Sequence, residues 1–103
     1  MENVIKFDLN EMGSLDIQSM NKVINAYIQI EPINHNFYDI SETGYNQNSG
    51  YVYIALENQI SICSAFNNEV EYLVTNFDNG EEFFFETYKE AKAKNLKVND
   101  ISY

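Results

Sequence analysis

The sequence predicts a two-layer α+β domain, in which two helices cover one face of an antiparallel sheet of four or five strands. Runs rich in Tyr, Val, Ile and Phe follow one another over residues 51–85 with short turns between them. This pattern favours a meander of antiparallel neighbours. Helical signals occupy residues 15–27 and 88–95. A length of 103 residues, 45% of them hydrophobic, fits a single compact domain over residues 1–103.

The first helix is expected to follow Gly13. Ser14 is a candidate N-cap, and Asp16 falls in the first turn, where the helix dipole favours an acid. Pro32 ends this helix if nothing ends it earlier. Residues 26–31 also fit a short strand, and the sequence does not separate the two alternatives. Apolar residues recur at the three- and four-residue steps of one helix face: Ile17, Met20, Ile24, Tyr27 and Ile28.

The meander is expected to contain strands at 51–56, 60–66, 70–77 and 81–85. Asn79-Gly80 is a strong hairpin signal between the last two. A further strand is expected at residues 4–9, where apolar and polar side chains alternate. Residues 32–50 lack a regular pattern. Because structureless loops of this length are uncommon in compact domains, the segment either holds a short strand around 37–40 or is a functional loop.

The second helix has a capping box, with Thr87 as the N-cap and Glu90 at the third helical position. It is expected to run to about Asn95. Four lysines follow Tyr88 and lie toward the C-terminal end of this helix, where the dipole favours cations. Helix stability therefore explains the basic tail without a binding role. These lysines are Lys89, Lys92, Lys94 and Lys97.

The charge is strongly unbalanced. Sixteen Asp and Glu stand against six Lys, and the net charge is -10. Fourteen of the acids and only two of the lysines fall within residues 1–88. A domain this acidic repels nucleic acid and anionic membranes and attracts basic surfaces. We therefore expect the partner to be a basic protein surface, with no direct binding to nucleic acid or to a membrane.

The sequence argues against an enzyme, a metal site and a cofactor. It has one His and one Cys, too few for a zinc site. With Gly80 as the glycine of a calcium loop, the first, third and fifth ligand positions fall on Thr75, Phe77 and Asn79, so the template fails. No glycine-rich phosphate loop is present. A single Cys63, no apolar run of membrane-span length and no signal peptide at residues 1–6 fit a bacterial cytoplasm.

Acidic side chains are the candidate binding residues. Glu69 and Glu71 stand two residues apart in an expected strand, about 7 Å from each other on one side. Because charges in duplex DNA recur about every 3.4 Å along each strand, such a row approximates alternate phosphates. A solvated acidic surface that only confers solubility is the alternative. The expected contact residues are Glu69, Glu71, Asp78, Glu81, Glu82 and Glu86. Asp39, Glu42 and the aromatic residues between positions 38 and 53, above all Tyr38 and Tyr45, are expected to form a rim.

The small size, strong acidity and compact α+β character of the whole chain resemble the anti-defence proteins of phages and mobile elements. Acidic anti-CRISPR proteins and other DNA mimics are the nearest group. The resemblance rests on general character, so no residue role is carried over. It implies a cytoplasmic inhibitor that fills the cleft in which a nucleic-acid-binding effector or nuclease holds DNA or RNA.

Two alternatives to this function stay open. One is an immunity protein or antitoxin that neutralises a basic toxin. The other is an interaction module that binds through its sheet face or an exposed strand edge. A strand edge is also the route by which the chain would form a homodimer.

Overall fold

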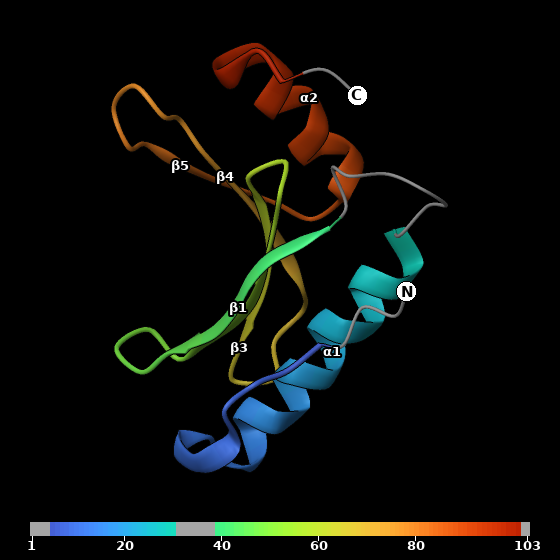
Figure 1. The fold of residues 1–103 in the computed structure, drawn as a ribbon, viewed down its shortest axis with the longest axis vertical. Helices are drawn as coiled ribbons and strands as arrows, with labels where there is room; N and C mark the ends of the chain where they lie inside the picture. The colour runs from blue at the N-terminus through green and yellow to red at the C-terminus, as the bar shows by residue number, and fades with distance from the viewer. Residues whose placement is uncertain (1–4, 31–38, 102–103) are drawn as a thin grey trace.

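The computed structural model describes residues 5–30 and 39–101 and shows two layers (Figure 1). Over these residues it contains a five-stranded antiparallel sheet in the order β1-β2-β3-β4-β5. The two-layer α+β fold and the meander are thus confirmed. The strands are β1 (Ile40–Asn46), β2 (Tyr51–Leu56), β3 (Ile60–Ala65), β4 (Glu71–Thr75) and β5 (Glu82–Phe85). The helices are α1 (Ser14–Ile30), α2 (Tyr88–Asn99) and the short 3-10 helix η1 (Leu9–Glu11).

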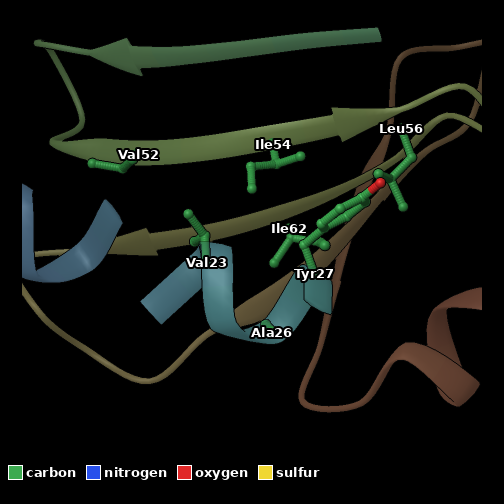
Figure 2. Packing of buried hydrophobic residues seen from close by; sticks show 7 residues of the cluster. All are labelled: Val23, Ala26, Tyr27, Val52, Ile54, Leu56 and Ile62. Atoms are coloured by element: carbon green, nitrogen blue, oxygen red, sulfur yellow. The ribbon is translucent and has the colours of Figure 1, made fainter. Parts of the chain in front are cut away.

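Both α-helices pack on the same face of the sheet. Figure 2 shows α1 inserting Val23, Ala26 and Tyr27 against the buried side chains of β2 and β3. Ala91 of α2 packs against Ile60 and Val74. Each fully buried Val, Ile or Leu contributes about 1.5–3 kcal/mol to stability. The sheet side of this core comprises Val52, Ile54, Leu56 and Ile62 next to α1.

Buried asparagines join α2 to the sheet. Asn58, in the β2–β3 turn, and Asn95, on α2, are both fully buried. The Nδ2 of Asn95 donates to the main-chain carbonyl of Asn58 at 2.9 Å, and the Nδ2 of Asn58 donates to the Tyr88 hydroxyl at 2.8 Å. The Oδ1 of Asn58 accepts from the Ile60 amide at 3.0 Å. Because buried polar groups must be paired, these bonds fix α2 in one position.

The same network continues to the end of β4 through Asn99. Its Nδ2 donates to the Asn95 Oδ1 at 2.7 Å and to the Thr75 carbonyl at 2.8 Å. Its Oδ1 accepts from the Phe77 amide at 3.0 Å. Side-chain amides thereby link the last turn of α2 to both the β2–β3 turn and the β4–β5 hairpin.

The two outer hairpins use the same five-residue turn. In each, an Asn carbonyl accepts from a Gly amide four residues later, at 2.7 Å for both Gly50 to Asn46 and Gly80 to Asn76. The glycines are left-handed, with φ of 74° and 75°, a conformation that glycine adopts without strain. The expected β4–β5 hairpin is confirmed, but the four residues from 77 to 80 form its loop, and Asn79 is not left-handed.

The N-terminal strand expected at residues 4–9 is wrong over the described residues. Residues 5–8 are outside any strand, and the 3-10 helix η1 follows. The Asp8 carboxylate caps η1 by accepting from the Asn10 amide at 3.0 Å, which bends the chain. Ile5 and Phe7 still pack on the core, as their alternation suggested. The fifth strand is instead β1, within the segment 32–50.

The first helix is longer than expected. It continues to Ile30, so the strand alternative for residues 26–31 is wrong up to that residue. The Gly13 carbonyl accepts from the Ile17 amide at 3.0 Å, and the Asp16 Oδ2 accepts from the Gly13 amide at 2.8 Å. Gly13 therefore holds the cap position, and Ser14 is the first helical residue rather than the N-cap.

The second helix begins as predicted. The Glu90 amide donates to the Thr87 Oγ1 at 3.2 Å, and this hydroxyl donates to the Glu90 carboxylate at 2.9 Å. The helix ends one turn after Asn95, where Asp100 turns left-handed and its amide donates to the Leu96 carbonyl at 3.0 Å. Within the described residues, none of the helices has the length and hydrophobicity of a membrane span.

Replacing Asn95 by Ala is expected to lower the free energy of unfolding by about 1–3 kcal/mol, because the buried Asn58 carbonyl loses its donor. Urea unfolding followed by circular dichroism measures this. The control is Asn21→Ala at an exposed position of α1, which should be neutral or slightly stabilising because Ala is the better helix former. Equal losses in the two variants would contradict a structural role for the network.

Candidate functional site on the uncovered sheet face

Neither α-helix covers the second face of the sheet, here called the uncovered face. The strand pairing Gly44–Tyr53–Cys63–Glu71 crosses it, and the pairing Ser61–Leu73–Phe84 runs beside it. Because side chains alternate along a strand, their neighbours two residues away point the same way. The side chains of this face are Glu42, Gly44, Asn46, Tyr51, Tyr53, Ala55, Ser61, Cys63, Ala65, Glu71, Leu73, Thr75, Glu82 and Phe84.

The central strand provides a floor of small side chains on this face. Here β3 carries Ser61, Cys63 and Ala65, while its neighbours carry large residues. The Tyr51 ring on β2 lies with its centroid 6.2 Å from that of Phe84 on β5, at an interplanar angle of 21°. Rings from strands that are not adjacent meet because the floor between them is low. They line an open hollow of about 450 Å³, together with Asn46, Ser49, Tyr53, Leu73 and Glu82.

Two tyrosines hold carboxylates beside this hollow. The Tyr51 hydroxyl donates to the Glu71 Oε1 at 3.1 Å, and the Tyr53 hydroxyl donates to the Glu42 Oε2 at 2.8 Å. Burial, followed by the bond to Glu71, raises the pKa of Tyr51. The bond to Glu42, followed by burial, raises the pKa of Tyr53. Both hydroxyls therefore stay protonated and keep orienting the carboxylates at neutral pH.

The floor residue Cys63 is unsuited to nucleophilic chemistry. Its side chain is only 3% exposed, and its thiol donates to the Glu71 carbonyl at 3.4 Å. Burial, then the charges of Glu71 and Glu82, raise the pKa of the thiol to about 12. Because the thiolate is the reactive form, this cysteine is inert at neutral pH. The arrangement is suited to contact and charge recognition.

Gly44 makes room for the Tyr53 ring, which forms one of the aromatic walls of the hollow. It pairs directly with Tyr53, and a Cβ at this position would lie 2.6 Å from the Cζ of the Tyr53 ring. The ring lies flat across the glycine, so it covers an otherwise weak point of the edge strand. This placement also directs the Tyr53 hydroxyl toward Glu42.

The structure brings together only some of the expected contact residues. Glu42, Glu71 and Glu82 share the uncovered face, spread over three strands. Asp78 and Glu81 are exposed in the β4–β5 hairpin beyond it. The carboxylates therefore form an array across the sheet instead of the single row expected along one strand.

Glu69 lies away from this array, so the expectation that it shares a side with Glu71 is wrong. It precedes β4, is 98% exposed and lies 3.8 Å from the Lys22 ammonium of α1. Strand alternation does not apply to it, because β4 begins only at Glu71. Glu86 follows β5 and lines a separate hollow with Glu69 and Lys22.

The expected rim is divided in the same way. Tyr45 pairs with Val52 and packs against the core on the helix side, so its ring does not face Glu42. Asp39 is exposed just before β1, where its carbonyl accepts from the Glu57 amide at 2.8 Å. Tyr38 lies outside the described residues.

The expected contact set lacked Phe84, and it included Tyr51 and Tyr53 only within the rim aromatics of residues 38–53, not as walls of a hollow. Their signal was present in the sequence. In β2 the tyrosines alternate with Val52 and Ile54, and the residues opposite them in β3 are small. Alternation identifies the face of a strand, but only the cross-strand register shows which large and small residues meet.

A third hollow, of about 610 Å³, lies between residues 6–8 and the β1–β2 hairpin. Its charged lining residues are Lys6 and Asp8, which carry opposite charges and favour no partner of one sign. The hollow of the uncovered face has a lining of one charge sign, that of Glu82, and is therefore the better candidate site for a charged partner.

No protein-family model matches the sequence, and no curated protein or solved structure was found to match it. Within residues 5–30 and 39–101, no three His, Cys, Asp or Glu side chains gather closely enough to hold a metal ion. The case for function therefore rests on the uncovered face itself.

The raised pKa of Cys63 predicts a loss of stability in alkali. The folded thiol keeps its proton up to about pH 12, whereas the unfolded thiol ionises near its ordinary value of 9.0. The contribution of the buried thiol to the free energy of unfolding is therefore complete below about pH 9. It is lost as the pH rises toward 12, at about 1.4 kcal/mol per pH unit. Urea unfolding is measured at about pH 8 and about pH 10, and the free energy of unfolding should fall more between these two values in the wild type than in Cys63→Ala. Identical losses in both proteins would contradict the raised pKa.

A double-mutant cycle tests the contact between Gly44 and Tyr53. Gly44→Ala is expected to destabilise the wild type by about 1–2 kcal/mol, because the new methyl group displaces the ring. In a Tyr53→Ser background the same change should be nearly neutral, so the coupling energy should exceed about 0.5 kcal/mol. Thermal unfolding of the four proteins measures it. Additive effects would mean that the ring does not lie across the glycine.

Proposed function

We propose that this chain is a non-catalytic binding protein that inhibits a nucleic-acid-binding protein by occupying its basic cleft. One observation carries the proposal. Residues 40–85, which contain the whole sheet, hold seven Asp and Glu and no Lys, Arg or His. Three of these acids, Glu42, Glu71 and Glu82, lie on the uncovered face.

Three lysines on the helices contact groups away from this face, whereas Lys6 lines the third hollow, at the β1 edge of the face, together with Gly44 and Tyr53. Lys22 lies on α1 and contacts Glu69. On α2, the Lys94 ammonium lies 4.1 Å from the centroid of the Phe83 ring, and the Lys92 ammonium 5.6 Å from that of Tyr88. These rings belong to the helix-facing layer, so Lys92 and Lys94 do not neutralise the charges of Glu71 and Glu82 on the uncovered face. The field of these carboxylates steers a basic partner to this face and speeds association.

The carboxylates of the face are also pre-arranged. Tyr51 and Tyr53 hold Glu71 and Glu42 by hydrogen bonds, and each carboxylate retains further acceptor positions. Side chains that are fixed before binding lose less conformational entropy in the complex. The ordered negative charges therefore favour stoichiometric binding to the Lys and Arg groups that otherwise contact phosphates.

The experiment uses a partner captured from bacterial lysate at low salt and then purified. We compare Glu71→Gln/Glu82→Gln with Glu57→Gln/Asp100→Asn, two variants that remove the same number of negative charges. The first should weaken binding by about tenfold or more, and the second by less than about threefold, since truncating a buried interfacial charge costs about 2–5 kcal/mol. Binding is measured by isothermal titration calorimetry over a range of salt concentrations.

A DNA or RNA ligand of the partner is then added as a competitor. Mutually exclusive binding supports occupation of the nucleic-acid cleft. Simultaneous binding of the nucleic acid and this protein would contradict that function. Equal weakening by the two double variants would show that the uncovered face is not the binding surface.

A further inference from the structure

The hollow on the uncovered face has the size of a side-chain pocket. Its volume of about 450 Å³ lies near the lower end of the range for small-ligand sites, about 300–1,000 Å³. One or two side chains fill such a space, whereas a helix or strand does not fit within it. Its walls include Tyr51, Tyr53 and Phe84, and its floor is Ser61 and Cys63.

The charge around the hollow selects a cation. Glu82 is the charged residue in its lining, and Glu71 approaches it through its bond to Tyr51. An apolar occupant would remove water from Glu82 without replacing those hydrogen bonds, which is costly. An anion would be repelled. A cation is attracted to the carboxylates and also to the faces of the aromatic rings.

The geometry distinguishes between the two long cationic side chains. The Tyr51 and Phe84 rings are nearly parallel, at an angle of 21°, so they present flat surfaces of similar orientation. A guanidinium is planar, stacks on such surfaces and can donate two hydrogen bonds to a carboxylate in one plane. An ammonium is a more strongly hydrated point charge and gains less from a flat wall.

We propose that this hollow receives an arginine side chain of a basic protein partner, with the guanidinium against the Tyr51 and Phe84 rings and paired with Glu82. The inference rests on the proposed function and adds the residue type that is recognised. The aromatic walls provide contact area, and Glu82 provides the charge partner. The acids beyond the hollow, in the β4–β5 hairpin, then serve for long-range attraction.

The test uses two defined probes, a capped tetra-arginine peptide and a capped tetra-lysine peptide. Each is titrated into the isotope-labelled full chain at low salt, and backbone amide shifts are followed by NMR. The arginine peptide is expected to bind at least about threefold more tightly, because a planar guanidinium stacks on the rings and pairs with Glu82 through two hydrogen bonds. The largest shifts should fall on the strands that form the hollow, at residues 51–53, 61–63, 73 and 82–84.

Two variants remove the parts of the pocket separately. Glu82→Gln removes the charge partner, and Phe84→Leu removes one aromatic wall at a position that is 43% exposed and outside the helix-facing core. Both should reduce the preference for arginine over lysine to less than about twofold, because the pairing or the stacking is lost. Glu57→Gln is the control, since it removes an equal charge from an exposed turn and should preserve the preference.

Equal affinities for the two peptides would overturn the arginine pocket. Shifts confined to residues 76–81, with Glu82→Gln and Glu57→Gln behaving alike, would also overturn it, while the acidic attraction behind the proposed function would remain. Conversely, an arginine-selective hollow combined with a partner that binds nucleic acid at the same time would support the pocket and contradict the proposed function.

Discussion

The side-chain amide network of Asn58, Asn95 and Asn99, of which the first two are buried, sets where α2 packs on the second half of the sheet. It fixes α2 against the β2–β3 turn and the end of β4. With α2 in that position, Phe83 and Phe85 face the helix layer, and Phe84 and Glu82 face the other way. The pocket on the uncovered face therefore depends on polar bonds formed on the opposite side of the sheet. Such networks are costly when incomplete, so they favour one arrangement of the helix.

The elements of the fold that could be predicted depend on residues close together in the sequence. The alternation in β2 and the capping box at Thr87 and Glu90 each need only neighbouring residues, and both were recovered from the sequence. The N-terminal segment shows the limit of this approach. Ile5 and Phe7 alternate as in a strand, yet the Asp8 cap turns the chain into η1 before a ladder forms. The repeated Asn-x-x-x-Gly turns were also local signals, but their spacing is longer than the two-residue hairpin rule.

The site was less predictable because it depends on register and on a turn. The β3–β4 turn places Phe66 and Asn67 in left-handed conformations, with φ of 52° and 61°. The Asn67 amide donates to the Ser19 Oγ at 2.6 Å, and the Lys22 ammonium donates to the Asn67 carbonyl at 2.7 Å. These bonds hold the turn against α1. Lys22 of α1 also contacts Glu69, which follows the turn. No periodicity rule distinguishes Glu69 from Glu71, because the contact that separates them comes from a helix more than forty residues away.

The uncovered face combines features that folding alone does not require. An exposed Phe84 and two tyrosines above a small-residue floor leave apolar surface in water, which usually promotes association. A symmetric contact between two copies through this face would bring Glu42, Glu71 and Glu82 of one copy against the same acids of the other. Like charges at close range oppose that contact. The carboxylates therefore oppose self-association through the aromatic surface, and they leave it open to the basic partner proposed above. A face that repels anions and other copies of itself, yet keeps an open aromatic hollow, favours the proposed binding of cations over a role in solubility alone.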